Sequence, residues 1–337
     1  MKRRLLIVAG VLFVAGLVAL GVAVRWLQAQ LEPMDPTGSE QPFTVERGKG
    51  LAQVAYALEA EGLIRDARVF VLLARYRELE SKLKMGEYLV SPAMRADEML
   101  EHLVSGRVRT YPVVIPEGLR SHEVAARIEQ AGLANAEELL DVIGDPAFAK
   151  QRGIPADNLE GYLFPDTYRL PKGMSARAVA GVLVDQFESV WREIEPLAPA
   201  TGLDKHEIVT LASIVEKETG AAEERPVIAA VFLNRLERGM RLETDPTVIF
   251  GIPDFDGNLR RVHLEDASNP YNTYRIPALP PGPIANPGRD ALHAVVAPAD
   301  SAYLYFVSRG DGTHKFSKTY AEHDRAVDEY QRRRRRR

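Results

Sequence analysis

Two glutamates lie close together in an otherwise apolar stretch and are the first candidates for chemistry. The stretch is LASIVEKETG, and the two acids are Glu216 and Glu218. Glutamate is rarely buried unless it is paired or functional. An acid surrounded by apolar groups holds its proton near neutral pH, as a general acid must. The stretch therefore predicts either a buried ion pair or an acid held in a cleft.

A helix from His206 to Thr219 must position both side chains. Its apolar residues cover most of the circumference, so we expect the helix to be buried nearly all round. Side chains two positions apart on a helix do not face each other, so Glu216 and Glu218 lie on opposite flanks and cannot act as a carboxylate dyad. Because both flanks are apolar, helical geometry alone does not choose between them.

Position along the helix favours Glu218 as the acid. Gly220 is suited to follow the end of a helix, which puts Glu218 in the last turn. There the negative end of the helix dipole and the apolar neighbours both raise the pKa of its carboxyl group. Glu216 lies about half a turn deeper, where Arg225 or Arg235 could pair with it. A salt-bridged, purely structural role remains open for either glutamate.

The composition excludes several classes of protein. The 337-residue chain has no cysteine, which excludes a disulfide scaffold, a thiol nucleophile and a cysteine-based metal site. A net charge of −4 argues against a general nucleic-acid binder. The 7 histidines are scattered without the spacing of a metal site, so we expect no metal and no cofactor.

An apolar run near the N-terminus predicts a membrane anchor. We assign residues 5–25 to a transmembrane helix, because about 20 apolar residues span the hydrocarbon core. Lys2, Arg3 and Arg4 precede the run, so residues 1–4 should stay in the cytoplasm while the rest crosses the membrane. A cleavable signal peptide is the alternative, but its apolar region is usually roughly 7–15 residues and ends in a small-residue cleavage site. The longer run favours a retained anchor.

A pattern of residues repeats in the first half of the chain. Residues 43–108 and 109–146 align at an offset of 70, with Gly62 matching Gly132. Each copy is predicted to contain a strand, a glycine turn, a helix, a Gly-Leu stop and a second helix. Such a unit resembles a LysM-like module, a type that binds glycan strands. A duplicated structural unit without a ligand is the alternative.

The glutamates belong to the remaining region, residues 147–330, which predicts a mixed α/β domain. Helices are expected at Ala176–Ile194 and Pro226–Arg238, and a hairpin from AYLYFVS and THKFSKT. A polar linker at residues 26–42 and a basic tail at residues 331–337 complete the layout. The fold class is therefore α+β, with an N-terminal transmembrane helix and a LysM-like α+β region before the mixed α/β catalytic domain.

Long motifs in this chain resemble those of one enzyme family. LASIVEKETG is followed by ERPVIAAVFLNRLERGMRLETDPTVIFG, and EGYLFPDTY, NPYNTYRIPALPPGPIANPG and YLYFVSRGDGTHKF occur in the family's order. With the single anchor and the LysM-like region, these motifs resemble the endolytic murein transglycosylases of the YceG-like family. The resemblance covers nearly the whole chain. Departures fall in the linker, around residues 135–155 and in the arginine tail.

The resemblance implies a lyase that acts on peptidoglycan. The second glutamate of the EKET stretch is the catalytic acid of the family, which is Glu218 here, and Glu216 would then be a supporting carboxylate. The substrate would be the β-1,4 bond between N-acetylmuramic acid and N-acetylglucosamine inside a nascent strand. One carboxylate suffices because the sugar's own C6 hydroxyl, which closes a 1,6-anhydro ring, replaces the activated water that glycoside hydrolysis uses.

Other residues of the motifs could bind the sugar, and each has a structural alternative. Asp245 in LETDPT could be a second carboxylate, but a cap before Pro246 or a role in shaping the cleft is favoured. Acids could bind hydroxyls or hold loops, tyrosines could stack on rings or pack, and amides could bind N-acetyl groups or cap turns. The further candidates are Glu160, Tyr162, Asn234, Asn272 and Tyr274.

The resemblance also implies a location and partners. The protein would be a single-pass protein of the bacterial inner (cytoplasmic) membrane, with a periplasmic or extracytoplasmic catalytic domain that terminates glycan elongation. Its partners would be peptidoglycan strands and, as a hypothesis, glycan polymerases and penicillin-binding proteins, with no nucleic acid. Two alternatives stay open: a true muramidase that uses Asp245 as its second carboxylate, and a non-catalytic, membrane-tethered glycan-binding scaffold.

Overall fold

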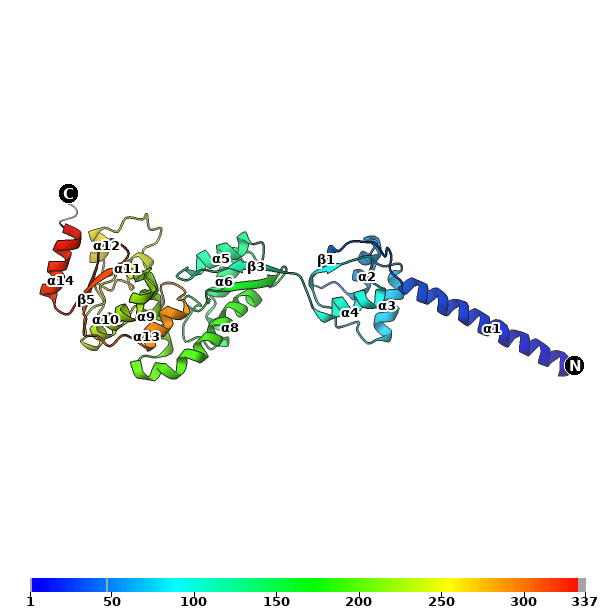
Figure 1. Cartoon of the computed structure of the whole chain (residues 1–337). Helices are drawn as coiled ribbons and strands as arrows, with labels where there is room; N and C mark the ends of the chain where they lie inside the picture. The colour runs from blue at the N-terminus through cyan, green and yellow to red at the C-terminus, as the bar shows by residue number, and fades with distance from the viewer. Residues whose placement is uncertain (1, 47, 333–337) are drawn as a thin grey trace. The chain divides into compact units, whose positions relative to one another are not determined.

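The computed structural model describes residues 2–46 and 48–332 (Figure 1). The chain divides into two compact units. One contains the chain up to Tyr111 together with Pro171–Met174, and the other contains Pro112–Leu170 and the chain from Ser175 onward. Residue 1 of the predicted cytoplasmic terminus and residues 333–337 of the predicted basic tail lie outside the described residues.

The first unit begins with a long apolar helix, α1 (Lys2–Leu31). Its segment Gly10–Leu31 has a mean hydropathy of 2.1 and is not buried against the rest of the protein. These 22 residues are long and apolar enough to cross a membrane as a helix. A signal sequence near the N-terminus would meet the same criteria, so retention of the anchor stays a prediction.

A two-stranded sheet and three helices form the rest of the first unit. β1 (Gln41–Val45) pairs in antiparallel fashion with β2 (Gly86–Val90), and Phe43 lies opposite Tyr88. Alternate residues of each strand are buried against the helices, since successive side chains of a strand point to opposite faces. The helices are α2 (Leu51–Ala60), α3 (Ala67–Tyr76) and α4 (Ala96–Ser105).

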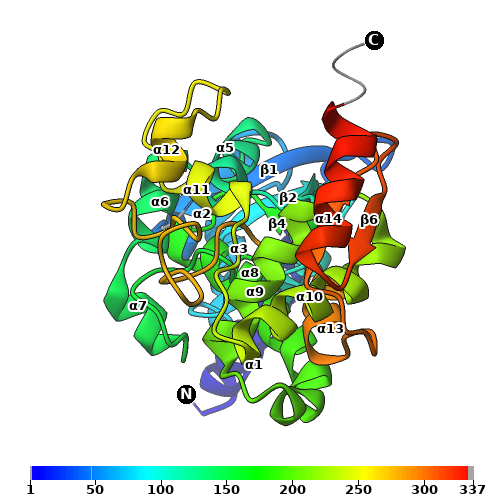
Figure 2. The same ribbon diagram turned by 90° about the vertical axis from the view of Figure 1, so that its left-hand side faces the viewer.

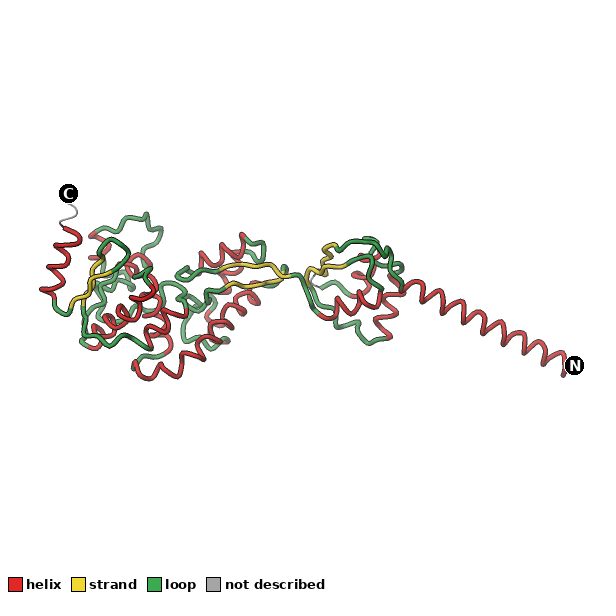
Figure 3. The backbone as a smooth tube through the Cα atoms, viewed as in Figure 1, coloured by secondary structure: helices red, strands yellow, loops and turns green. Residues whose placement is uncertain are grey.

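The predicted repeat is visible in the local structure. The elements of its second copy, residues 109–146, are β3 (Thr110–Val114), α5 (Ser121–Gln130) and α6 (Ala136–Ile143), and the strand β4 (Thr167–Pro171) follows later in the chain. The chain leaves α2 through Gly62 and α5 through Gly132, and both glycines have a φ of 68°, which residues with a side chain rarely adopt. β4 pairs with β3 as β2 pairs with β1 (Figure 3). The repeated order and turn are confirmed, whereas glycan binding stays a prediction.

The second copy belongs to the compact unit that contains Glu218. α6 packs against α8 (Ala176–Ile194). The backbone N–H of Gly118 donates to the carbonyl of Asn286, and the N–H of Asn286 donates to the carbonyl of Leu119, each at 2.9 Å. The segment that enters α5 is therefore tied to the loops that surround the two glutamates.

α9 (Lys205–Glu218) is the central helix of the second unit. Every residue from Ile208 to Val215 is buried. α10 (Arg225–Glu237) and α13 (Arg289–Val296) pack beside it (Figure 2). The expected helix, buried nearly all round, is confirmed, with each end shifted by one residue.

The other elements of the second unit are short. They are α7 (Pro146–Gln151), the 3-10 helices η1 (Glu195–Thr201) and η2 (Ala222–Glu224), α11 (Asp245–Phe250), α12 (Arg261–Glu265), β5 (Tyr305–Ser308), β6 (His314–Ser317), α14 (Tyr320–Val327) and a π-helical turn, η3 (Asp328–Arg332). β5 and β6 pair in antiparallel fashion, which confirms the predicted hairpin. The helices expected at 176–194 and 226–238 are confirmed to within one residue.

Two glycine substitutions should change stability in opposite directions. No atom lies within 4 Å of a Cβ added at Gly132, but its φ of 68° is left-handed, so Gly132→Ala should lower the free energy of unfolding by about 1 kcal/mol. Gly181 lies inside α8 with equal space, so Gly181→Ala should raise it by roughly 0.5–1 kcal/mol. Thermal unfolding of the full chain in detergent micelles measures both. A stabilising Gly132→Ala would contradict the left-handed turn.

Candidate active site

A pocket of about 430 Å³ lies at the C-terminal end of α9 and contains Glu218. We call it the Glu218 pocket. The end of α9, the segment that enters α11, the β5–β6 hairpin and the C-terminal helical segment supply its walls. The polar residues that carry its chemistry are Glu218, Thr244, Asp245, Tyr274 and His314.

Glu218 is the last residue of α9, and Thr219 leaves the helix in an extended conformation. The hydroxyl of Thr244 donates a hydrogen bond to Oε1 of Glu218. Burial raises the pKa of Glu218 to about 6; the charge of Asp245 adds to the rise, and the Thr244 hydrogen bond and His314 oppose it. The carboxyl group can therefore give up and take back a proton close to neutral pH.

Asp245 and Tyr274 form a hydrogen-bonded pair in the same pocket. Asp245 is the first residue of α11, and Thr244, not Asp245, occupies the cap position. The Tyr274 hydroxyl donates to Oδ1 of Asp245 at 2.8 Å. Burial raises the pKa of Tyr274, and Asp245 adds to the rise, so the tyrosine keeps its proton and remains a donor. Asp245 therefore does not have the capping role, and it shapes the pocket through Tyr274.

His314 is a pocket residue that the sequence analysis did not select. Its Nδ1 lies 2.7 Å from Oε2 of Glu224, and its backbone N–H donates to Oε1 of the same carboxylate at 2.9 Å. Because a carboxylate accepts hydrogen bonds, Nδ1 carries the hydrogen and Nε2 is left for other partners. Thr244 was missed as well, although both residues belong to motifs that were recognised.

Arg235, expected only as a possible partner of Glu216, also lines the Glu218 pocket. Its guanidinium donates to the backbone carbonyls of Leu304, Arg241 and Leu242 at 2.7 to 3.0 Å. It is also ion-paired with Glu243 at 3.3 Å. These contacts join α10 to the segment that enters α11 and to the strand β5. Arg235 therefore fixes the walls between which Glu218 lies.

Glu216 has the other role considered for these acids, that of a buried, paired carboxylate. Its side chain is 6% exposed, and its Oε1 lies 3.0 Å from the guanidinium of Arg225. The backbone N–H of Gly288 donates to its Oε2 at 3.1 Å. Arg225 also pairs with Glu117 at 3.3 Å. Of the two predicted partners, Arg225 and not Arg235 pairs with Glu216.

Glu160 and Tyr162 lie outside the Glu218 pocket. Glu160 accepts the backbone N–H of Ser121 at 3.1 Å, and burial raises its pKa to about 7. Tyr162 is fully buried, with its hydroxyl 2.8 Å from Nδ1 of His206 and its ring packed edge-on against Phe187. A ring without an exposed face cannot stack on a sugar in this conformation, so packing accounts for Tyr162.

The two asparagines among the candidates hold loops. Asn234 donates through its amide to the carbonyls of Ser301 and Tyr303 at 2.9 and 3.0 Å. Asn272 is fully buried, and its amide donates to the carbonyls of two residues of α12 and of Asp266, which follows that helix. The structure thus brings Asp245 and Tyr274 together with Glu218 and leaves Glu160, Tyr162, Asn234 and Asn272 elsewhere. Within the described residues, no three acidic or histidine side chains are grouped as a metal site requires.

Removing Arg225 should destabilise the protein strongly. Arg225→Met leaves Glu216 buried without a counter-charge, which should lower the free energy of unfolding by about 3–5 kcal/mol. The control is Arg289→Met, because the ion pair of Arg289 with Glu193 is exposed and should contribute less than about 1 kcal/mol. Thermal and urea unfolding of the full chain compare the two. Equal losses in the free energy of unfolding would show that the ion pair of Glu216 with Arg225 stabilises the fold no more than an exposed ion pair does.

Comparison with known proteins assigns the chain to a family. The sequence model of the YceG-like family matches residues 43–329. An endolytic murein transglycosylase of Bacillus subtilis (strain 168) is 28% identical over 328 residues, which cover 92% of this chain and 91% of that protein. A protein of the same name from Streptococcus pneumoniae serotype 2 (strain D39 / NCTC 7466) is 27% identical, and the alignment covers 91% of this chain and 61% of that protein.

A solved structure supports the same assignment. The 2.6 Å crystal structure of a YceG-like protein from Listeria monocytogenes superposes with a TM-score of 0.59 at 30% sequence identity. The match covers 86% of this chain and 100% of that chain. Because the family match extends from residue 43 to residue 329, this chain belongs to the YceG-like family.

Proposed function

We propose that this protein is an endolytic peptidoglycan transglycosylase with Glu218 as its general acid and base. The observation that carries the proposal is the position of Glu218, which ends a buried helix at a pocket and has its pKa raised by burial to about 6. The name of the relatives from Bacillus subtilis and Streptococcus pneumoniae supplies the reaction class. Family membership over most of the chain supports the transfer of that class.

The first step would be proton transfer to the leaving group. Protonated Glu218 donates its proton to the glycosidic oxygen between N-acetylmuramic acid and N-acetylglucosamine, and the bond from that oxygen to C1 breaks. The bond electrons stay on the departing oxygen, which leaves as the hydroxyl of N-acetylglucosamine. Asp245 carries a negative charge in the same pocket, so it favours the protonated form of Glu218 before this step.

The second step would regenerate the acid. The Glu218 carboxylate takes the proton of the C6 hydroxyl of the muramic acid, and the C6 oxygen forms the new bond to C1. The product is a 1,6-anhydro end, and no water is consumed. Thr244 holds the Glu218 carboxylate through its hydroxyl in both steps. A single acid thus serves both half-reactions, whereas hydrolysis usually employs two carboxylates.

The first unit supports a role at the membrane and on glycan strands. α1 is long and apolar enough to anchor the chain, and the residues before it favour a cytoplasmic N-terminus. The β1–α2–α3–β2 order fits the LysM-like module inferred from the repeat. We therefore infer an extracytoplasmic enzyme that cuts nascent strands and so terminates their elongation, in partnership with glycan polymerases and penicillin-binding proteins.

A muramidase is the second candidate, because Asp245 lies in the same pocket as Glu218. Asp245 could activate a water for attack on C1, as the second carboxylate of a hydrolase does. The two reactions give products of different mass, since hydrolysis adds one water and the transglycosylase reaction does not. Mass analysis of the reducing ends therefore separates the two candidates.

Glu218→Gln should remove the activity while leaving the fold intact. We expect the rate of release of 1,6-anhydro products to fall by roughly 10²–10⁴-fold, since the acid and base are lost. The assay incubates purified uncross-linked glycan strands with the full chain in detergent micelles and identifies the products by mass spectrometry. The control is Glu223→Gln, which alters an exposed glutamate outside the pocket and should leave the rate unchanged. Full activity of Glu218→Gln would refute the proposal.

The same substitution should stabilise the protein in a pH-dependent way. The pKa of Glu218 is raised from 4.5 to about 6, so ionised Glu218 costs the folded state free energy. The cost is absent below about pH 4.5, grows as the pH rises towards 6 and is complete above it, at up to about 2 kcal/mol. Glu218→Gln should therefore melt at a higher temperature than the wild type near pH 8 and at the same temperature near pH 4. Coincident melting curves at both pH values would contradict the raised pKa.

A further inference from the structure

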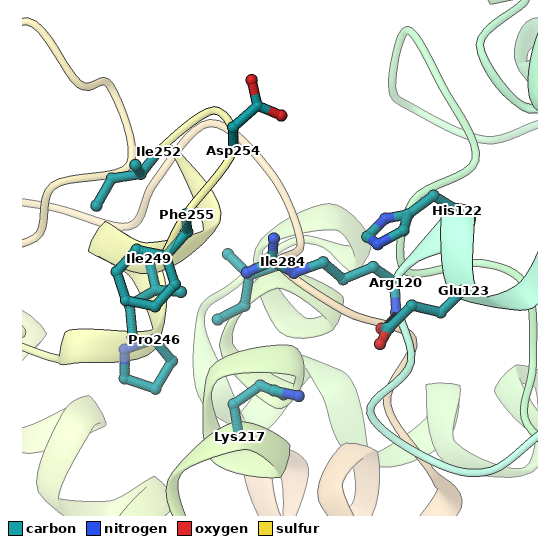
Figure 4. Close-up of a pocket in the computed structure, with 10 residues that line it drawn as sticks. All are labelled: Arg120, His122, Glu123, Lys217, Pro246, Ile249, Ile252, Asp254, Phe255 and Ile284. Atoms are coloured by element: carbon teal, nitrogen blue, oxygen red, sulfur yellow. Dashed lines mark hydrogen bonds between the residues drawn. The ribbon is translucent and has the colours of Figure 1, made fainter. Parts of the chain in front are cut away.

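A second pocket of about 710 Å³ has no part in the two proton transfers. Figure 4 shows it between α11 with its following loop, on one side, and the start of α5, on the other. We call it the side pocket. Its apolar side includes Ile249, Ile252 and Phe255, and its polar side includes Arg120, His122 and Lys217.

The side pocket and the Glu218 pocket share two helix ends. Lys217 lines the side pocket, and the next residue, Glu218, lines the Glu218 pocket. At the start of α11, Pro246 lines the side pocket and Asp245 lines the Glu218 pocket. Successive residues of a helix point about 100° apart, so neighbouring residues of these two helix ends, here called the ridge, face different pockets. A branch of a substrate bound at Glu218 would enter the side pocket by crossing this ridge.

Two cations of the side pocket make contacts that leave their charge available. The guanidinium of Arg120 lies 4.9 Å from the centre of the Phe250 ring, and Nζ of Lys217 donates to the carbonyl of Gly118 at 3.1 Å. Two acids lie near Arg120. Burial raises the pKa of Glu160 to about 7, so it is only partly charged at neutral pH. Glu123 also lines the pocket and accepts the backbone N–H of Arg120 at 2.8 Å, not its guanidinium. Arg120 is half-buried, where a charge attracts an anion more strongly than in bulk water.

The rest of the lining favours a peptide over a sugar. The described lining contains no Asn, Gln, Ser, Thr or Tyr, so all of its polar side chains are ionisable, which suits the charged groups of a peptide. The apolar side is mostly aliphatic, which suits small apolar side chains. Asp254 also lines the pocket, so an amine has a partner as well as a carboxylate. This combination fits a short peptide with carboxylates, methyl groups and an amine.

We propose that the side pocket binds the peptide stem of the substrate, with the stem carboxylates at Arg120 and Lys217 and its small apolar side chains at Ile249 and Ile252. The inference rests on the proposed function, because peptidoglycan carries its stem on C3 of the muramic acid ring whose C1 is attacked. A stem of about four residues extends about 13 Å, which is enough to cross a ridge one helix end wide. The enzyme would thereby select strands that still carry their stems.

The test compares two forms of one substrate. Uncross-linked strands are used either with their stems or after an amidase has removed the stems, and kcat and KM are measured with the full chain in detergent micelles. We expect wild-type kcat/KM to be about tenfold higher on the stem-bearing strands, which corresponds to about 1.4 kcal/mol. Arg120→Gln should remove this preference through a higher KM and leave the rate on stem-free strands unchanged. Arg120→Lys, which keeps the charge, should retain part of the preference.

Arg238→Gln is the matched control, because Arg238 is exposed and lies outside both pockets. This variant should leave kcat/KM unchanged on both substrates. Equal wild-type kcat/KM on the two substrates would overturn the proposal. An equal loss of kcat/KM on stem-bearing and stem-free strands in Arg120→Gln would overturn it as well. If thermal unfolding shows that Arg120→Gln does not fold, Ile252→Asp replaces it. The new negative charge should repel the stem carboxylates and lower kcat/KM on stem-bearing strands alone.

A wild-type chain that cuts neither substrate would refute the proposed function without deciding the ligand of the side pocket. In that case, calorimetric titration with a synthetic stem tetrapeptide decides whether the side pocket binds the stem. Binding to the wild type that is lost in Arg120→Gln would support the side pocket as a peptide site. No binding to the wild type, or equal binding to both, would overturn the inference.

Discussion

The burial of the carboxylate groups in the last turn of α9, where Lys217 between them stays exposed, is the constraint on which the second unit depends. Two carboxylates lie in this turn, and a carboxylate taken out of water must be paired or must hold a proton. Glu216 is paired, because Arg225 and the N–H of Gly288 reach it. Glu218 has a hydroxyl as its nearest partner and Asp245 as a like-charged neighbour, so its pKa rises to about 6 and it releases its proton later than an ordinary glutamate. One physical requirement thus produces an ion-paired acid and an acid with a raised pKa two residues apart.

Much of this fold could be predicted from the sequence because helix and strand periods are local properties. The apolar positions of α9 and α8, the hairpin β5–β6 and the repeated glycine turns all follow from residues close together in the chain. The candidate site was harder to predict from the sequence. Which flank of α9 meets Arg225 depends on the packing of α10, and Thr244 reaches Glu218 from 26 residues along the chain. No period connects such residues, so His314 and Thr244 went unselected inside motifs that had been recognised.

The motifs that identify the family mostly specify backbone geometry. Asn272 binds three carbonyl groups, Arg235 binds three more, and Asn286 ties the loop before α5 to the loop before α13. An amide or guanidinium that satisfies several carbonyls cannot be replaced without leaving some of them unpaired. This explains why polar residues that looked suited to sugar binding, such as Asn272, instead hold the loops around Glu218. Only a small set of side chains is left for chemistry.

The walls of the Glu218 pocket come from widely separated parts of the chain. The acid lies at the end of α9, but the opposite wall contains His314 and His323, and Gln331 from the last described turn. During synthesis, a chain that has emerged only as far as β5 already contains Glu218 but lacks this wall, so the acid remains open to water. Water would lower the pKa of such an acid towards its ordinary value. The described lining of the Glu218 pocket is therefore complete only in a chain that extends to residue 331.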